Sequence, residues 1–283
     1  MYQLKVENKY GQQLELTNNE AYVVTDVDGL YPADGTINTT RNASADGSVF
    51  NSSYVNEKQI IITLSINSPA EENRINLYRY FKTKEPVKVY FKNDSRNVFI
   101  EGYVKNCNIG FFDKKQIFQS TITCPDPYFK NTNPVEVDFS KTIPLFEFPF
   151  SIEEGEPIPF SDLGGQPKIS INNSGDVEAG FIIHLYSRND VVNPVVYSET
   201  INQYIGLNMT LRQGEEVIIN TIKKQRSVTL ISGGTKTNLI NKLKFGSEWI
   251  YLIAGYNTIG VSADSNIDDM EVNCELNVLY EGV

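Results

Sequence analysis

Apolar and polar residues alternate along much of the chain with the two-residue period of half-buried β-strands. In the segment KQIIITLSI, one face carries Ile60, Ile62, Leu64 and Ile66. The segments RNVFIEGYV and QIFQSTITC, residues 96–104 and 116–124, repeat this pattern. The lysine-bearing residues 113–116 before the second run read as the tip of a hairpin. We therefore expect the first half of the chain to fold around β-strands.

One segment of this half has helical periodicity instead. Ser68 is expected to cap a helix, and Pro69 suits its first position. Ile75, Tyr78 and Phe81 then recur at helical spacing, with Leu77 beside them. We expect this helix to cover one face of a sheet.

Composition changes after residue 125, because eight of the 12 prolines lie between Pro125 and Pro167. Proline cannot donate to a β-ladder, so this segment should be extended chain at a sheet edge. The domain boundary is placed near residues 130–134. It separates an N-terminal domain, residues 1–130, from a C-terminal domain, residues 131–283, which begins with the proline-rich segment 131–167.

The C-terminal half consists of short apolar runs separated by Gly, Asn and Asp. The runs are GFIIHLY, VVYSETI, MTLRQ, EVIINTI, SVTLI, WIYLIA, NTIGVSA and VNCELNVLYEGV. Their number and spacing predict a two-sheet sandwich or jelly roll. The expected fold class is mainly β, with one α-helix and a β-hairpin in the N-terminal domain.

Charge separates the two halves. Residues 1–130 contain 15 basic and 15 acidic side chains, whereas residues 131–283 contain 10 and 20. Neither half has the basic stripe that would neutralise phosphates, which argues against nucleic acid as a partner. No run of about 18 apolar residues predicts a membrane span, and the N-terminus lacks the apolar region of a secretory signal.

Candidate chemistry is sparse. His184 is the only histidine, which excludes Ser-His-Asp and Cys-His catalysis and a zinc site with two imidazoles. Cys107, Cys124 and Cys274 form no C-x-x-C pair and are expected to be reduced and mostly buried. We therefore assign no catalytic, cofactor-binding or metal-binding residue and predict that the protein is not an enzyme.

The loop TDVDGLYPADG, residues 25–35, is the strongest metal-site candidate because of its three aspartates. Counted from Asp26, Leu30 and Tyr31 occupy the fifth and sixth positions of an EF-type loop, where a ligand and a glycine are required. The loop is therefore interpreted as a turn, with Leu30 and Tyr31 packed under the sheet.

The order of these features resembles the distal tail proteins (Dit) of long-tailed bacteriophages. The resemblance rests on DVDGLYPADGTI, RNASADGSVF, KQIIITLSI, EENRINLYRYF, RNVFIEGYV and FQSTITCPDPYF in the first half. In the second half it rests on INNSGDVEAGFIIHLY, LRQGEEVIINT and WIYLIAGYNTIGV before the final LYEGV. The resemblance implies that the C-terminal sandwich is galectin-like.

The resemblance also implies a structural role in the tail tip of a virion or tail-like particle, assembled from protein made in the bacterial host cytoplasm. The N-terminal domains would form a hexameric ring between the tail tube protein and the tail-associated hub protein. The C-terminal domains would point outward and carry parts such as a receptor-binding protein. It implies no cofactor and no contact with nucleic acid or membrane.

The hairpin tip GFFDKKQ is the candidate subunit interface, through Phe111, Phe112, Lys114 and Lys115. The alternative is that both phenylalanines are buried under the sheet. At the level of function, the alternative is a carbohydrate-binding adhesin that acts through the C-terminal sandwich. A hydrolase is the weakest hypothesis, because His184 stands alone and no acidic pair has a distinctive context.

Overall fold

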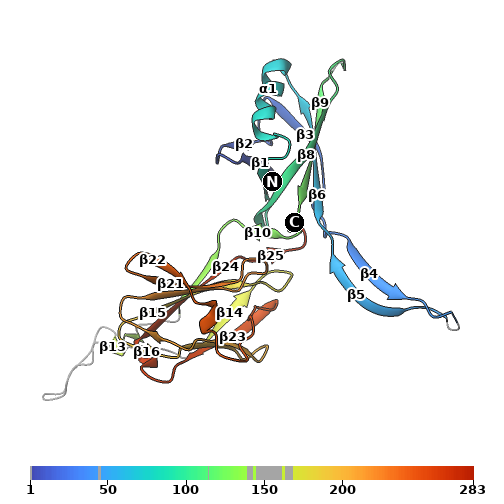
Figure 1. Ribbon diagram of the computed structural model, residues 1–283. Coiled ribbons are helices and arrows are strands. Elements are labelled where there is room, and N and C mark those ends of the chain that lie inside the picture. Colours follow the sequence, from blue (N-terminus) through green and yellow to red (C-terminus); the bar gives the residue numbers. More distant parts are fainter. Residues whose placement is uncertain (1, 44–45, 114, 139–142, 145–160, 163–167) are drawn as a thin grey trace. The chain divides into compact units, whose positions relative to one another are not determined.

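The computed structural model describes residues 2–43, 46–113, 115–138, 143–144, 161–162 and 168–283. It is mainly β, as the sequence predicts, and the described residues contain one α-helix (Figure 1). The chain divides into two compact units. The N-terminal unit contains Met1–Thr132 together with Leu279–Val283, and the C-terminal unit contains Asn133–Val278. The sequence pattern grouped the last five residues with the sandwich, whereas in the structure they extend the N-terminal sheet.

The N-terminal unit is built on one nine-stranded antiparallel sheet. Its main path has the order β2-β1-β7-β8-β9-β6-β3, and β10 pairs with both β8 and β25. The strands are β1 (Gln3–Asn8), β2 (Gln13–Glu15), β3 (Tyr22–Asp28), β6 (Lys58–Ile66), β7 (Pro86–Lys92), β8 (Asn97–Ile109), β9 (Ile117–Cys124), β10 (Phe129–Asn131) and β25 (Leu279–Tyr280).

Alternate residues of the central strands form the core of this unit, and the predicted faces of β6, β8 and β9 are confirmed. The buried side chains include Ile60, Ile62, Leu64, Val98, Ile100, Phe118 and Ile122. Gly102 continues the buried face of β8, where a Cβ atom would lie 2.6 Å from the Cγ2 atom of Ile122. The two strands therefore pack too closely for a larger residue at this position.

Helix α1 (Ala70–Tyr80) forms where the sequence predicts it, and two of the four apolar residues expected to pack on the sheet are buried. Leu77 is the buried residue of the helix, and Phe81, one turn later, is buried just beyond its end. Ile75 and Tyr78 are exposed, so their expected packing on the sheet is wrong. Leu77 and Phe81 are four positions apart and therefore lie next to each other on the buried side of the helix. The helix begins after Pro69, without the side-chain cap expected from Ser68.

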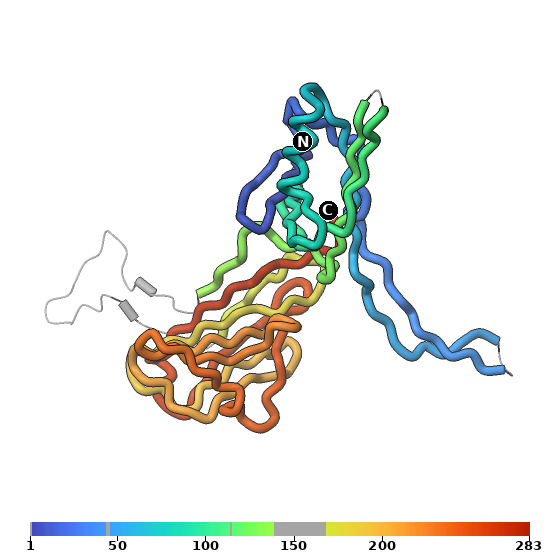
Figure 2. Tube along the Cα trace, turned by 45° about the horizontal axis from the view of Figure 1, so that its top comes forward, coloured from blue at the N-terminus to red at the C-terminus, as the bar shows by residue number. Residues whose placement is uncertain are grey.

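Strands β4 (Gly35–Thr40) and β5 (Val49–Val55) form a separate two-stranded sheet that leaves the main sheet. Figures 1 and 2 both show this hairpin extending away from the rest of the N-terminal unit. Every residue of its two strands except Thr36 is exposed. We call β4, β5 and the turn that joins them the arm.

The loop between β3 and the arm has one position that only glycine can occupy. Gly29 has a φ of +89°, and a Cβ atom there would lie 2.0 Å from the carbonyl oxygen of Gln59. Leu30 packs against the core as expected, but Tyr31 is 60% exposed, so its predicted burial is wrong. A hydrogen bond to the Asp28 carboxylate holds the Tyr31 hydroxyl and raises its pKa.

The C-terminal unit contains a six-stranded sheet with the order β11-β24-β15-β20-β21-β22 and a four-stranded sheet with the order β14-β23-β17-β18. The six-stranded sheet comprises β11 (Val135–Asp138), β15 (Phe181–Ser187), β20 (Glu216–Asn220), β21 (Ser227–Ser232), β22 (Thr235–Asn238) and β24 (Met270–Leu276). The four-stranded sheet comprises β14 (Lys168–Asn173), β17 (Val195–Ser198), β18 (Gln203–Gly206) and β23 (Gly255–Ser262). The short elements are β12 (Ile143–Pro144), β13 (Ser161–Asp162), β16 (Val191–Val192), β19 (Thr210–Leu211), η1 (Ile240–Lys242) and η2 (Ile267–Asp269).

Both sheets alternate buried and solvent-facing side chains, as expected for a sandwich. One expected strand is absent, because residues 249–254, WIYLIA, make only an isolated bridge between Ala179 and Leu252. Ile250 and Leu252 are nevertheless fully buried, so the two-residue period reflects burial without a ladder. In the proline-rich segment, β11 is an edge strand as predicted, and residues 139–142, 145–160 and 163–167 lie outside the described part of the chain.

Lys58 is a buried lysine at the start of β6 and only 3% exposed. Its ammonium group donates hydrogen bonds to the carbonyl oxygens of Tyr31 and Glu281, each at 2.7 Å. Burial lowers the pKa of Lys58 to about 8, because the charged form loses its hydration. The carboxylate of Glu281 and the thiol of Cys124 are the titratable groups that act on it electrostatically.

We predict that Lys58 makes the stability of the N-terminal unit depend on pH. The folded state releases this proton near pH 8 and the unfolded chain near 10.5, so the unfolded state binds more protons between these values. The unfolding free energy should therefore rise with pH in this window. We expect the unfolding free energy of the wild type to rise by about 2 kcal/mol relative to that of Lys58→Met from pH 8 to pH 10.

Urea denaturation across this pH range measures the effect. Lys130→Met serves as the control, because Lys130 is a partly exposed lysine that pairs with Asp126 and Glu101. Parallel pH profiles for the wild type and Lys58→Met would contradict the prediction.

Candidate interaction surfaces

The tip of the β8–β9 hairpin is exposed. Strand pairing ends at Ile109 and Phe118, and the intervening residues extend past the ladder. Phe111 is 54% exposed and Phe112 fully exposed, so the alternative in which both rings are buried is wrong. Lys115 is exposed as well, whereas Lys114 lies outside the described residues. The role of this tip as a subunit interface stays a prediction.

A cation–π contact joins this tip to the helix. The guanidinium carbon of Arg74 on α1 lies 4.7 Å from the centroid of the Phe111 ring. Ile75 and Tyr78 of the same helix are also exposed. Phe111 is therefore held against the unit, and Phe112 is left as the side chain with no shielding from its own chain.

The arm carries five exposed large apolar side chains, and the sequence-based predictions include no strands for it. The set consists of Ile37, Val49, Phe50, Tyr54 and Val55. The available signal was the β-branched and aromatic alternation in TINTT and VFNSSYV, on either side of the turn-forming residues 41–48. Such side chains on an edge-exposed hairpin are suited to contact with another chain.

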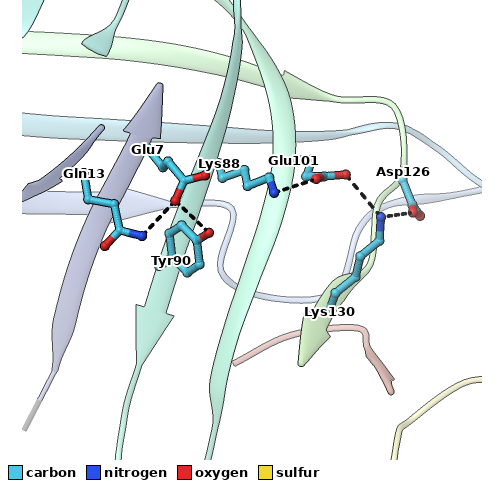
Figure 3. Close-up of polar contacts among 7 residues, drawn as sticks. All are labelled: Glu7, Gln13, Lys88, Tyr90, Glu101, Asp126 and Lys130. Carbon is cyan, nitrogen blue, oxygen red and sulfur yellow. Dashed lines mark hydrogen bonds and ion pairs between the residues drawn. The ribbon is translucent and has the colours of Figure 1, made fainter. Parts of the chain in front are cut away.

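The solvent-facing side of the N-terminal sheet has the opposite character. Figure 3 shows a row of polar side chains that crosses the sheet. The Glu7 carboxylate accepts hydrogen bonds from Gln13 at 2.7 Å and from Tyr90 at 3.1 Å. Burial, followed by the hydrogen bond to Glu7, raises the pKa of Tyr90 to about 12.

Further along the same row, the Glu101 carboxylate lies 3.4 Å from the ammonium groups of both Lys88 and Lys130 (Figure 3). Asp126 completes the row at 3.3 Å from Lys130. The charged side chains of this row are thus paired within the unit. The arm and the hairpin tip, by contrast, expose apolar side chains.

The C-terminal unit carries a polar hollow of about 240 Å³ on the solvent face of its six-stranded sheet. It is lined by Glu136, Asp138, His184, Tyr186, Glu271, Val272, Asn273 and Glu275. The His184 ring makes a 2.6 Å contact from Nδ1 to the Glu216 carboxylate and stacks at 6.2 Å on the Tyr186 ring. His184 is therefore a mostly buried strand histidine that contacts a carboxylate at the edge of the hollow.

The structure offers little for metal or thiol chemistry. Among the described residues, no three His, Cys, Asp or Glu side chains are grouped so that they could hold a metal ion. All three cysteines are free, and burial raises the pKa of Cys124 to about 12. Within the same part of the chain, no helix is long and apolar enough to cross a membrane.

One protein family is similar to part of the C-terminal half. Residues 174–274 match the family described as siphovirus-type tail component, C-terminal domain. No curated protein matches the chain.

Two solved phage structures share the whole architecture. The crystal structure of the Dit protein of phage SPP1, described as a paradigm of the hub adsorption apparatus in phages that infect Gram-positive bacteria, has a TM-score of 0.69 and 12% identity, with 99% of each chain covered. A chain of the baseplate of phage P2 in its activated conformation with Ca has a TM-score of 0.51 and 14% identity, with 97% of this chain and 98% of that chain covered. The resemblance to the distal tail proteins is confirmed: residues 174–274 are similar to the C-terminal domain of the siphovirus-type tail component family, and over nearly its whole length the chain has the fold of SPP1 Dit.

Proposed function

We propose that the protein is a structural component of a phage tail tip or baseplate and works as a hexameric ring. In this role it joins the tail tube protein to the tail-associated hub protein, and its C-terminal units serve as attachment points for host-recognition parts such as a receptor-binding protein. The role is geometric rather than enzymatic and requires no cofactor. The matched tail-component domain and the Dit fold support the general role.

The exposed apolar arm is the observation that best supports a ring. A hairpin of two strands is at best marginally stable alone in water, and burying one of its large apolar side chains would contribute about 1.5–3 kcal/mol. The arm differs from the polar sheet face of its own unit. It would therefore contact a surface of the neighbouring copy other than that copy's arm. Such a heterologous contact generates a closed ring when its rotation closes after a whole number of subunits.

We predict that Phe50→Ser with Tyr54→Ser prevents ring formation. Both rings are about 60% exposed, so the change should leave the unfolding free energy of the monomer nearly unchanged. It should weaken each subunit contact by about 2 kcal/mol or more per aromatic anchor. Light scattering for mass, with negative-stain electron microscopy for shape, reads the outcome.

The matched control for the arm is Tyr256→Ser, which removes a 75% exposed tyrosine from the C-terminal unit. Rings should persist in this variant. Intact rings in the double arm variant would contradict the role of the arm, and a wild-type chain that is monomeric at every concentration would contradict the ring itself.

The hairpin tip is proposed as a second contact. Phe112→Ser should reduce assembly, or binding to the tube or hub protein, by about tenfold or more without changing the melting temperature. Phe245→Ser is the control, because Phe245 is equally exposed but lies in the C-terminal unit. Sedimentation velocity of the two variants side by side makes the comparison, and equal assembly of both would remove the tip from the interface.

The polar hollow favours one second candidate, the carbohydrate-binding adhesin. A hollow with carboxylates, an amide and an aromatic ring has the groups that bind sugar hydroxyls. Its acidic lining would repel anionic polymers, so the ligand would be a neutral saccharide. Calorimetry should then detect binding of neutral cell-wall saccharides, and Asn273→Ala with Tyr186→Ala should abolish it. Absence of heat across a panel of such saccharides would exclude this candidate.

A further inference from the structure

The arm is joined to the sheet at a narrow base. The chain enters the arm through residues 29–34 and leaves it through residues 56–57. The amide of Asn56 donates to the carbonyl oxygen of Asp34 at 2.8 Å, and a 2.9 Å hydrogen bond joins the side chains of Thr36 and Asn56. These contacts close the hairpin, but they do not fix its direction relative to the sheet.

The segment Leu279–Val283 lies against this base, as the position of the chain end in Figures 1 and 2 shows. The amide of Val283 donates to the carbonyl oxygen of Leu30 at 3.0 Å. Gly282 lies so close that a Cβ atom there would be 3.1 Å from the same oxygen and 3.2 Å from Cδ of Pro32. Residues from the end of the sequence thus hold the strand that enters the arm.

Lys58 connects this segment to the two stretches of chain that enter and leave the arm. It directly follows the residues that leave the arm, and its two hydrogen bonds reach Tyr31 on the entering side and Glu281 on the segment. Because both acceptors are backbone carbonyls, the ammonium group fixes the path of the main chain rather than the rotamer of a side chain. One group therefore joins three stretches of chain.

The segment is itself anchored on the sheet. Strand β25 pairs with β10 through Tyr280 opposite Phe129 and Leu279 opposite Lys130. The guanidinium carbon of Arg96 lies 4.3 Å from the centroid of the Tyr280 ring, and Arg96 also donates to the carbonyl oxygen of Gly282. The connection from the sheet to the arm base is thus continuous and made of packed or hydrogen-bonded groups.

Simple core filling does not explain a lysine at this position. Residues 60, 62, 64 and 66 on the same face of β6 are all isoleucine or leucine and are buried. An apolar residue at 58 would continue that row, whereas burial of an ammonium group costs free energy unless its donors are satisfied. The two carbonyl acceptors satisfy it only when the arm base and the segment are both in place.

We propose that Lys58 and the segment Leu279–Val283 form a clasp that sets the direction of the arm, and that ring assembly needs this clasp in addition to the apolar side chains of the arm. The second clause rests on the proposed ring function, whereas the first does not. Lys58 and Gly282 are positioning residues in this proposal and make no contact with a neighbouring subunit.

Spin-label distance measurement by pulsed EPR tests the direction of the arm. Labels are attached at Ser53→Cys on the arm and Lys92→Cys on the sheet, both exposed positions. Cys107 is replaced by Ser, while Cys124 and Cys274 remain, because burial keeps their thiols protonated and inaccessible. All proteins also carry Phe50→Ser and Tyr54→Ser, so that no ring forms and each distance belongs to a single chain.

The clasp predicts a narrow distance distribution in this background. Lys58→Met and Gly282→Ala should each widen the distribution about twofold, because an arm released at its base samples more directions. Lys130→Met should leave the width unchanged. Gly282→Ala is the milder variant and keeps the test decisive if Lys58→Met unfolds, which circular dichroism reports.

Assembly is then measured with the arm aromatics restored. Lys58→Met and Gly282→Ala should lower the fraction of rings although every apolar residue of the arm is present. Unchanged distance distributions in folded variants would overturn the clasp whatever the ring does. A wild-type chain that forms no rings would overturn the proposed function and leave the first clause to be decided by the distances alone.

Discussion

The one-sided burial of the N-terminal sheet is the constraint on which the rest of this unit depends. Its central strands place one row of side chains in the core and leave the other row in water. Helix α1 covers the buried face through Leu77, with Phe81 just beyond its end. The opposite face is occupied by paired charges. The five large apolar side chains of the arm therefore have no core of their own and are exposed.

The same constraint explains the position of Lys58. The buried row of β6 begins at Lys58, directly after the chain returns from the arm. A lysine can bury its aliphatic stem and still donate hydrogen bonds to the two backbone carbonyls at this junction. Lys58 and the buried residues from Ile60 onward are thus successive inward-facing positions of one strand. The apolar residues stabilise the core, and Lys58 holds the base of the arm.

The two halves of the chain differ in net charge and in the surface features that they expose. The N-terminal half is electrically neutral and carries the arm and the hairpin tip, which suits packing among identical subunits. The acidic half forms a sandwich whose exposed sheet face holds the polar hollow. Like-charged C-terminal units would repel one another in a ring, so their outward placement in the proposed assembly is favoured electrostatically.

Elements whose burial follows a simple period could be predicted from the amino-acid sequence alone. The faces of β6, β8 and β9, the β8–β9 hairpin and most strands of the C-terminal unit could be read from alternation, because period-2 burial leaves a period-2 pattern. The order of short segments also gave the resemblance to distal tail proteins. The hairpin tip was located as well, although its exposure was left open between two alternatives.

Three features depend on tertiary packing instead: the exposure of Ile75 and Tyr78 on the helix, the burial of WIYLIA with only an isolated bridge, and the arm as an exposed hairpin. Tertiary packing also places Leu279–Val283 in the N-terminal unit, with Glu281 beside Lys58 although 223 positions separate them. Contacts between residues this far apart depend on how the sheets close, and the local pattern around Lys58 contains no trace of its partner. Local periodicity indicates which residues are buried. The hydrogen bonds proposed to set the direction of the arm form only when Glu281 lies beside Lys58 and Tyr31.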